Sequence, residues 1–175
     1  ELFSAPHMEP FNIHALLERV LASETAAMGS KVEFKRDFDP SLPPVIGDSD
    51  HLQQAFQNLI RNAAEAASDG GVPAKVTVRT SYAAGLSFRQ ARLGAGLRRA
   101  MLVSVEDTGK GIPRNRQSSI FEVFQSSKSG ARGLGLSIVK EVVTAHGGQI
   151  RVDSVPGSTR FSVLLPLGTG ERSDG

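Results

Sequence analysis

The run VEDTGKGIP, residues 105–113, combines one aspartate with two closely spaced glycines and a proline. Asp107 comes at the end of the apolar stretch Met101–Glu106, which has the pattern of a strand. A carboxylate in this position can accept a hydrogen bond from an exocyclic amine, and Gly109 and Gly111 allow the backbone to approach a flat ring. Alone, the D-x-G-x-G pattern is a weak signal, since most such runs are ordinary turns.

A second group of polar side chains lies on one predicted helix. Asn58, Asn62 and Glu65 are spaced by four and three residues and therefore share a face. Asparagine is unfavourable inside helices because its amide competes for backbone groups, so two of them one turn apart need another reason. An amide oxygen is a hard ligand that suits Mg²⁺ bound together with phosphates and water. The alternative is a solvated polar face.

The third motif is RGLGLSIVKEV. Gly133 and Gly135 are predicted to open a helix whose first N–H groups could meet phosphate oxygens. A glycine at a helix start is again a weak signal by itself. The order of the three motifs along the chain is far more specific than any one of them.

The apolar periodicity predicts the elements that must position these residues. Predicted helices cover Ile13–Met28, a segment from Asp48 or Asp50 to about Ser68, and Gly133–His146, with a short helical turn at Ser118–Phe124. Predicted strands cover Val32–Phe38, the region of Val76 and Val78, Met101–Glu106, Gln149–Val155 and Thr159–Leu165. This order predicts an α/β two-layer sandwich, a mixed sheet with three helices on one face.

Composition bounds the class of protein. The 175 residues are 39% hydrophobic, which fits one domain over residues 1–167 followed by a disordered tail, 168–175. A net charge of +2 suits an anionic ligand, but the arginines lack the interleaved aromatic residues of a nucleic-acid surface. The absence of cysteine excludes disulfides. No run is long and apolar enough for a bilayer, so we expect no membrane span and a cytoplasmic setting.

On these motifs the chain resembles the ATP-binding catalytic domain of two-component sensor histidine kinases, in the gyrase, heat-shock-chaperone and kinase ATPase superfamily. QNLIRNAAEA resembles the N box, VEDTGKGIP the first glycine box, IFEVF the F box and GLGLSIV the second glycine box. The segment RDFDPSLPPVIGD, and VTVRT followed by a long excursion over Tyr82–Arg99, are most similar to the nitrogen-regulation sensor kinases.

The resemblance implies a role for each matching residue, with ATP and Mg²⁺ as cofactors. Asp107 would bind the adenine amino group, with Gly109 and Gly111 flanking the ring. Asn62 would ligate Mg²⁺, and Asn58 would lie near the triphosphate, so that these two are the expected catalytic residues.

The same resemblance implies a phosphate-binding lid. The residues expected to face the phosphates are Lys128, Arg132, Gly133, Leu134 and Gly135. Phe121 and Phe124 would anchor the lid, although both could equally be core residues. The chain has Ala131-Arg132 where the family usually has Gly-Thr. The arginine can supply a charged fork for phosphate oxygens; the alternative is a short, impaired lid.

Two features indicate which reaction the domain would serve. Hydrolytic members carry a glutamate base at the place of Asn58, and an amide cannot take a proton from water. The family's acceptor histidine is followed by Glu or Asp, and none of the four histidines is.

The resemblance therefore implies three kinds of partner: a separate histidine phosphoacceptor and dimerisation domain, a response regulator and a nitrogen-signal protein. The longer protein would be a homodimer and this domain monomeric. A nucleotide-sensing or docking module without phosphotransfer stays open, and so does a self-contained ATPase, against which Asn58 argues.

Overall fold

The computed structural model describes residues 5–71, 73–83, 99–122 and 130–167, and describes residues 130–134 by their backbone alone. The predicted tail at 168–175, most of the excursion after Tyr82, Phe124 and Lys128 lie outside these ranges.

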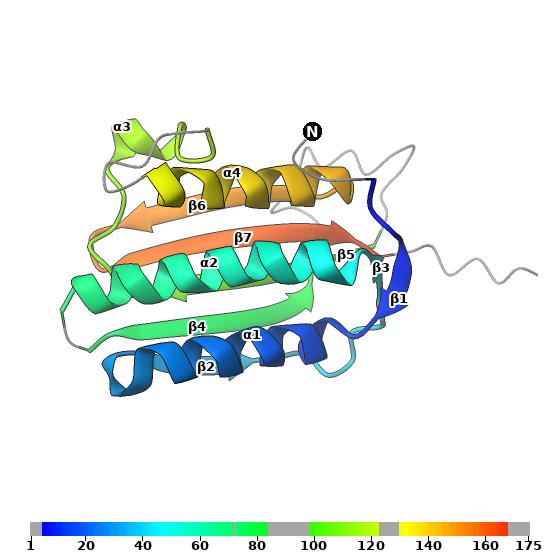
Figure 1. Cartoon of the computed structure of the whole chain (residues 1–175), viewed down its shortest axis with the longest axis horizontal. Helices are drawn as coiled ribbons and strands as arrows, with labels where there is room; N and C mark the ends of the chain where they lie inside the picture. The colour runs from blue at the N-terminus through cyan, green and yellow to red at the C-terminus, as the bar shows by residue number, and fades with distance from the viewer. Residues whose placement is uncertain (1–4, 72, 84–98, 123–129, 168–175) are drawn as a thin grey trace, which may run out of the picture.

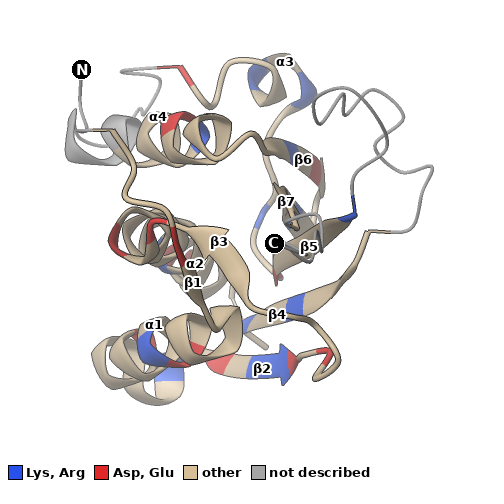
Figure 2. Cartoon of the chain, turned by 90° about the vertical axis from the view of Figure 1, so that its right-hand side faces the viewer, with Lys and Arg blue, Asp and Glu red and all other residues tan. Residues whose placement is uncertain are grey.

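A five-stranded mixed sheet forms one layer of the protein (Figure 1). Its strands, in spatial order, are β2 (Glu33–Asp37), β4 (Lys75–Tyr82), β5 (Ala100–Asp107), β7 (Ser158–Pro166) and β6 (Gln149–Val155). β2 and β4 are parallel, and the other neighbours are antiparallel. Helices α1 (Ile13–Met28), α2 (Ser49–Asp69) and α4 (Gly130–Ala145) cover one face of this sheet (Figure 2). The predicted fold class is confirmed.

Side-chain caps fix where α1 and α2 begin. The Asn12 carboxamide oxygen accepts a hydrogen bond from the backbone N–H of His14 at 2.9 Å, as expected of an N-cap. Of the two aspartates considered for α2, Asp48 is the cap, because its carboxylate accepts from the His51 N–H at 3.1 Å.

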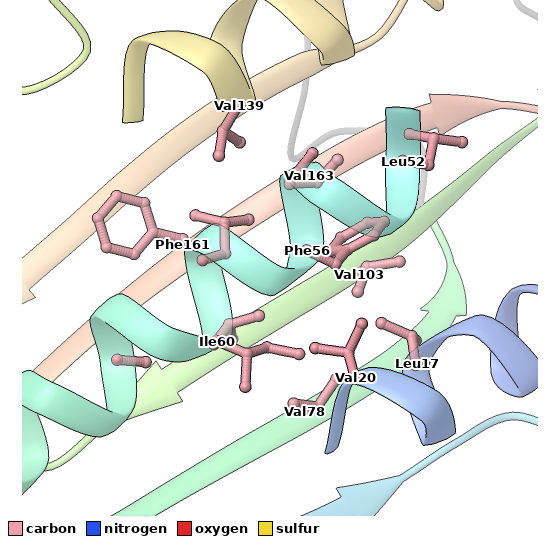
Figure 3. Packing of buried hydrophobic residues seen from close by; sticks show 14 of the residues in the cluster. Leu17, Val20, Leu52, Phe56, Ile60, Val78, Val103, Val139, Phe161 and Val163 are labelled. Atoms are coloured by element: carbon pink, nitrogen blue, oxygen red, sulfur yellow. The ribbon is translucent and has the colours of Figure 1, made fainter. Parts of the chain in front are cut away.

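The core lies between α2 and the sheet, with α1 and α4 on either side (Figure 3). Phe56 of α2 packs beside Val103 and Val163, and Ile60 lies above Val78. The apolar stripe predicted for α2 is thus the buried one, while Asn58 and Asn62 on its flank are half-buried. The helix therefore presents its amides along the edge that borders α4.

Two local predictions need correction. Helix α4 begins at Gly130 instead of Gly133. The short helix α3 occupies Arg114–Gln117, just before the predicted turn at Ser118–Phe124, whose described residues do form turns, with the Glu122 N–H donating to the Ser119 carbonyl at 3.0 Å. The predicted bounds of α1 are confirmed, and a 3₁₀ turn, η1 (Gly29–Lys31), follows this helix.

A two-stranded antiparallel sheet of β1 (Glu9–Phe11) and β3 (Val45–Gly47) was not predicted. Each strand has three residues, and neighbouring prolines gave the sequence the pattern of a loop. Val45 is 1% exposed and joins the core, which ties this small sheet to the main body.

Candidate functional site

Asp107, the last residue of β5, is a buried carboxylate with one unused oxygen. The residue is 1% exposed. Its Oδ1 accepts a hydrogen bond from the Gly109 N–H at 2.8 Å, whereas Oδ2 has no partner among the residues that the structure describes. Leaving a buried polar atom unpaired costs roughly 1–3 kcal/mol. Such an atom suits a ligand that brings its own donor.

Burial also changes the acidity of this group. Removal from water raises the pKa of the Asp107 carboxyl to about 6, with a smaller push in the same direction from the charge of Glu106. The hydrogen bond from Gly109 acts in the opposite direction. At neutral pH the carboxyl is therefore still mostly ionised and able to accept a hydrogen bond.

The two glycines after Asp107 are required by close packing of the chain on itself. A Cβ at Gly109 would lie 2.8 Å from the carbonyl oxygen of Ala66 on α2. Gly111 has a φ of +88°, and a Cβ there would lie 2.7 Å from the carbonyl oxygen of Val155. The missing side chains thus let the loop pack between α2 and the turn that joins β6 to β7. Their predicted contact with an adenine ring stays a prediction.

Hydrogen bonds hold this loop in place on two sides. The Gly157 N–H donates to the Gly109 carbonyl at 3.0 Å, and the Ile112 N–H donates to Ser154 Oγ at 2.8 Å. On the other side, the Lys75 N–H donates to Thr108 Oγ1 at 3.0 Å. The loop is therefore preorganised around Asp107. Sequence reasoning missed Thr108 and Ser154, because a lone hydroxyl in a turn gives no specific signal.

The N-box helix and the second glycine box lie side by side. Helices α2 and α4 run in opposite directions (Figure 1), and a side chain at Gly135 would begin 4.0 Å from Cγ of Asn58. Asn62 lies one turn closer to Ala66, the residue that touches the Gly109 loop. Asp107, the two asparagines and the start of α4 are thus brought to one end of the molecule.

The structure describes Phe121 with its side chain, but describes the predicted lid residues Arg132, Gly133 and Leu134 by their backbone alone. The Phe121 ring packs edge-to-face on Phe161 of β7, with ring centres 6.0 Å apart. Arg132, Gly133 and Leu134 lie in the first turns of α4. Since the helix begins at Gly130, its unpaired N–H groups belong to residues before Gly133. The phosphate contacts of Gly133 and Gly135 remain predictions, as do those of Arg132 and Leu134.

A two-layer fold with this loop and these helices defines an ATPase-type nucleotide-binding domain. A family model described as "Histidine kinase-, DNA gyrase B-, and HSP90-like ATPase" matches residues 47–169. The chain belongs to this family.

Individual relatives narrow the comparison to histidine kinases. The sensory histidine kinase/phosphatase NtrB of Rhodobacter capsulatus is 42% identical over 166 residues, which cover 95% of this chain and 46% of the relative. NtrB of Azospirillum brasilense is 42% identical over 89% of this chain and 38% of its own length. The chain spans about half or less of the length of these relatives.

A solved structure, the mycobacterial sensor histidine kinase MprB, is similar with a TM-score of 0.72 and 30% identity, over 92% of this chain and 98% of that one. The chain is thus a member of the histidine kinase catalytic-domain family. In the part of the chain that the structure describes, no helix is long and apolar enough to cross a membrane.

The raised pKa predicts that nucleotide affinity depends on pH. The expected hydrogen bond from the adenine amine is stronger to an ionised carboxylate, so affinity for ADP should hold above pH 6 and fall below it, by up to about tenfold at pH 5. Calorimetric titration between pH 5 and 8 measures this fall. An Asp107→Asn variant is the control. Titration of the ADP phosphates affects binding to both proteins equally, but the variant has no group that titrates at position 107. Parallel pH profiles of the two proteins would contradict the prediction.

Proposed function

We propose that this chain binds Mg-ATP and transfers the γ-phosphoryl group to a histidine on a separate phosphoacceptor and dimerisation domain. The observation that carries the proposal is the unpaired, buried Oδ2 of Asp107 in a domain of this ATPase family. That oxygen accepts a hydrogen bond from the adenine amine. The rigid loop around Gly109 and Gly111 holds it in position.

The polar edge of α2 fits the metal and phosphates. Asn62 would supply an amide oxygen to Mg²⁺, and Asn58, which borders α4, would lie beside the phosphates. When bound, the ion neutralises phosphate charge. Lys128 and Arg132 are proposed to contact the phosphates from the lid side, where a lysine acts as a point charge and an arginine as a fork.

Transfer to a histidine is favoured over hydrolysis because the site has no base at the position of Asn58. An imidazole nitrogen of the acceptor attacks the γ-phosphorus with its lone pair. The bond to the bridging oxygen breaks, and ADP leaves with that electron pair. The imidazole nucleophile needs no base on this domain, whereas water does.

We place the acceptor on another domain, because two histidines of this chain are held by contacts within the fold and none has an acceptor's sequence context. His146 is 7% exposed, with its Nδ1 at 2.8 Å from the Val142 carbonyl and its Nε2 accepting from the Asp48 N–H at 2.9 Å. His14 stacks on Phe38. None of the four has the sequence context of an acceptor.

The further partners follow from the same proposal. A structural neighbour, histidine kinase ThkA, was solved in complex with the response regulator protein TrrA, and we propose a response regulator as the final acceptor here. By similarity to the NtrB relatives we also propose a nitrogen-signal protein as a partner, a cytoplasmic setting, and a homodimer in the longer protein.

Removal of one amide tests the metal ligand. Asn62→Ala should leave the fold intact, because the side chain is only half-buried, yet abolish most of the tightening of ATP binding by Mg²⁺, on the order of tenfold for a loss of 1.4 kcal/mol. Titrations with Mg²⁺ and with EDTA measure the difference. Gln54→Ala, an exposed amide on the same helix, is the matched control. A lowered melting temperature of Asn62→Ala with unchanged metal dependence would assign the residue a structural role instead.

Radiolabelling tests the transfer itself. With γ-labelled ATP, this chain alone should stay unlabelled, whereas adding a cognate phosphoacceptor domain should place an acid-labile, base-stable label on that domain. Stable label on any of the four histidines of this chain would overturn the assignment. Steady release of inorganic phosphate by the chain alone would favour the ATPase alternative.

A further inference from the structure

Glu24 of α1 is a buried carboxylate that the proposed site does not use. In the described part of the chain three acidic residues are buried: Asp107, Asp48 and Glu24. Asp107 has an oxygen open to a ligand and Asp48 caps α2, whereas the Glu24 side chain, 3% exposed, has neither role. Burying a charge is costly unless the charge is paired, so this position needs a reason.

The partners of Glu24 both belong to α2. Its Oε1 accepts one hydrogen bond from Gln57 Nε2 and another from Arg61 Nε, the latter at 3.2 Å. Gln57 and Arg61 are four residues apart, so they lie one above the other on the side of α2 that faces α1. A single oxygen of α1 thus binds two successive turns of α2.

The residues next to these partners are the two asparagines of the proposed metal and phosphate site. Asn58 follows Gln57, and Asn62 follows Arg61. Successive helix residues are about 100° apart around the axis. The pair bound to Glu24 therefore faces α1, while the asparagines lie toward α4 on the other side of α2 (Figure 1). Any rotation of α2 about its axis moves both pairs together.

The apolar contacts of α2 resist such a rotation unevenly. The large buried side chains all lie at or before residue 60: Leu52, Phe56, Leu59 and Ile60. The later turns bury alanines: Ala63, Ala64 and Ala67. A methyl group interlocks with a facing surface less than a branched or aromatic side chain does. The half of α2 that carries Asn62 is therefore the half that its apolar packing holds less firmly.

We propose that Glu24 is a positioning residue for the Mg-ATP site, which fixes the rotation of α2 and so directs the amides of Asn58 and Asn62. This inference rests on the proposed function. Mg²⁺ tolerates little error, because it requires near-octahedral geometry at short ligand distances. For an amide about 5 Å from the helix axis, a rotation of about 20° is a displacement of about 2 Å. The adenine contact is less sensitive, because Asp107 belongs to β5.

A purely stabilising role would not require a carboxylate here. An apolar side chain of similar size fills the same space without the cost of burying a charge. When Glu24 is replaced, both partners can reach water, since Gln57 is half-buried and the Arg61 side chain is 55% exposed. Glu24→Leu should therefore preserve the fold while it removes both hydrogen bonds.

Nucleotide titrations of Glu24→Leu test the proposal. The tightening of ATP binding by Mg²⁺ is the ratio of the dissociation constants in EDTA and in Mg²⁺, and it should fall about fivefold or more. Affinity for ADP in EDTA should stay unchanged, because it depends on Asp107. Glu24→Gln should keep most of the tightening, because its amide oxygen still accepts from Gln57 and Arg61.

The matched control is Glu18→Leu on the same helix. The Glu18 carboxylate accepts a hydrogen bond from Arg36 Nε of β2 at 2.7 Å, so it pairs α1 with the sheet and not with α2. This variant should change neither the tightening by Mg²⁺ nor the affinity for ADP in EDTA.

Nuclear Overhauser contacts without nucleotide give a second readout. The Asn58 side-chain amide should contact the α-protons of Gly135, because a Cβ at Gly135 would lie 4.0 Å from Asn58 Cγ. Glu24→Leu should weaken this contact. Gln57→Leu, which removes a partner outside the core, should weaken it too, and Glu18→Leu should not. If Glu24→Leu does not fold, Gln57→Leu decides by the same criteria.

An unchanged Asn58 contact and an unchanged Mg²⁺ dependence in Glu24→Leu would overturn the proposal. Equal losses of affinity in EDTA and in Mg²⁺ would overturn it too, because a merely structural residue behaves in that way. If the unaltered chain shows no tightening by Mg²⁺ while Glu24→Leu still displaces the Asn58 amide, the proposed function alone is wrong.

Discussion

The site depends on the contact between the backbone of Gly109 and the carbonyl of Ala66. This contact leaves no room for a Cβ, which would lie 2.8 Å from the Ala66 oxygen and equally close to Asp107 Oδ1. It fixes the end of β5 against the last turns of α2. A carboxylate from the sheet and an amide from the helix are thereby held at one end of the fold, although Asn62 and Asp107 are far apart in sequence.

Burial of the ionised Asp107 carboxyl lowers the stability of the fold at neutral pH and leaves an acceptor atom for a ligand. The folded-state pKa of Asp107, about 6, lies above its ordinary value of 3.8, so the protonated form stabilises the fold below about pH 4 and that contribution is lost as the pH rises through 6. Two pKa units correspond to about 3 kcal/mol. A ligand that donates to Oδ2 recovers part of this cost, which is the expected behaviour of a functional residue.

The sequence predicted the fold class and the layers because the apolar periodicity of α1, α2 and the core strands agrees with their final burial. It did not predict β1 and β3, since strands of three residues show no recognisable alternation, β1 contains Pro10, and β3 follows Pro43 and Pro44. The motif order led to Asp107, but only the structure shows that the glycines after it pack against Ala66 and Val155. The unpaired Oδ2 is likewise a property of packing, which no local pattern encodes.

The central claim is that Asp107 Oδ2 accepts a hydrogen bond from the adenine amine. Calorimetric comparison of ADP with inosine diphosphate tests it most directly, because the two nucleotides carry the same phosphates and differ on the purine edge, where a carbonyl replaces the amine. A hydrogen bond to a charged group contributes roughly 1.5–3 kcal/mol, so ADP should bind about 10- to 100-fold more tightly. Equal affinity for the two nucleotides would contradict the account.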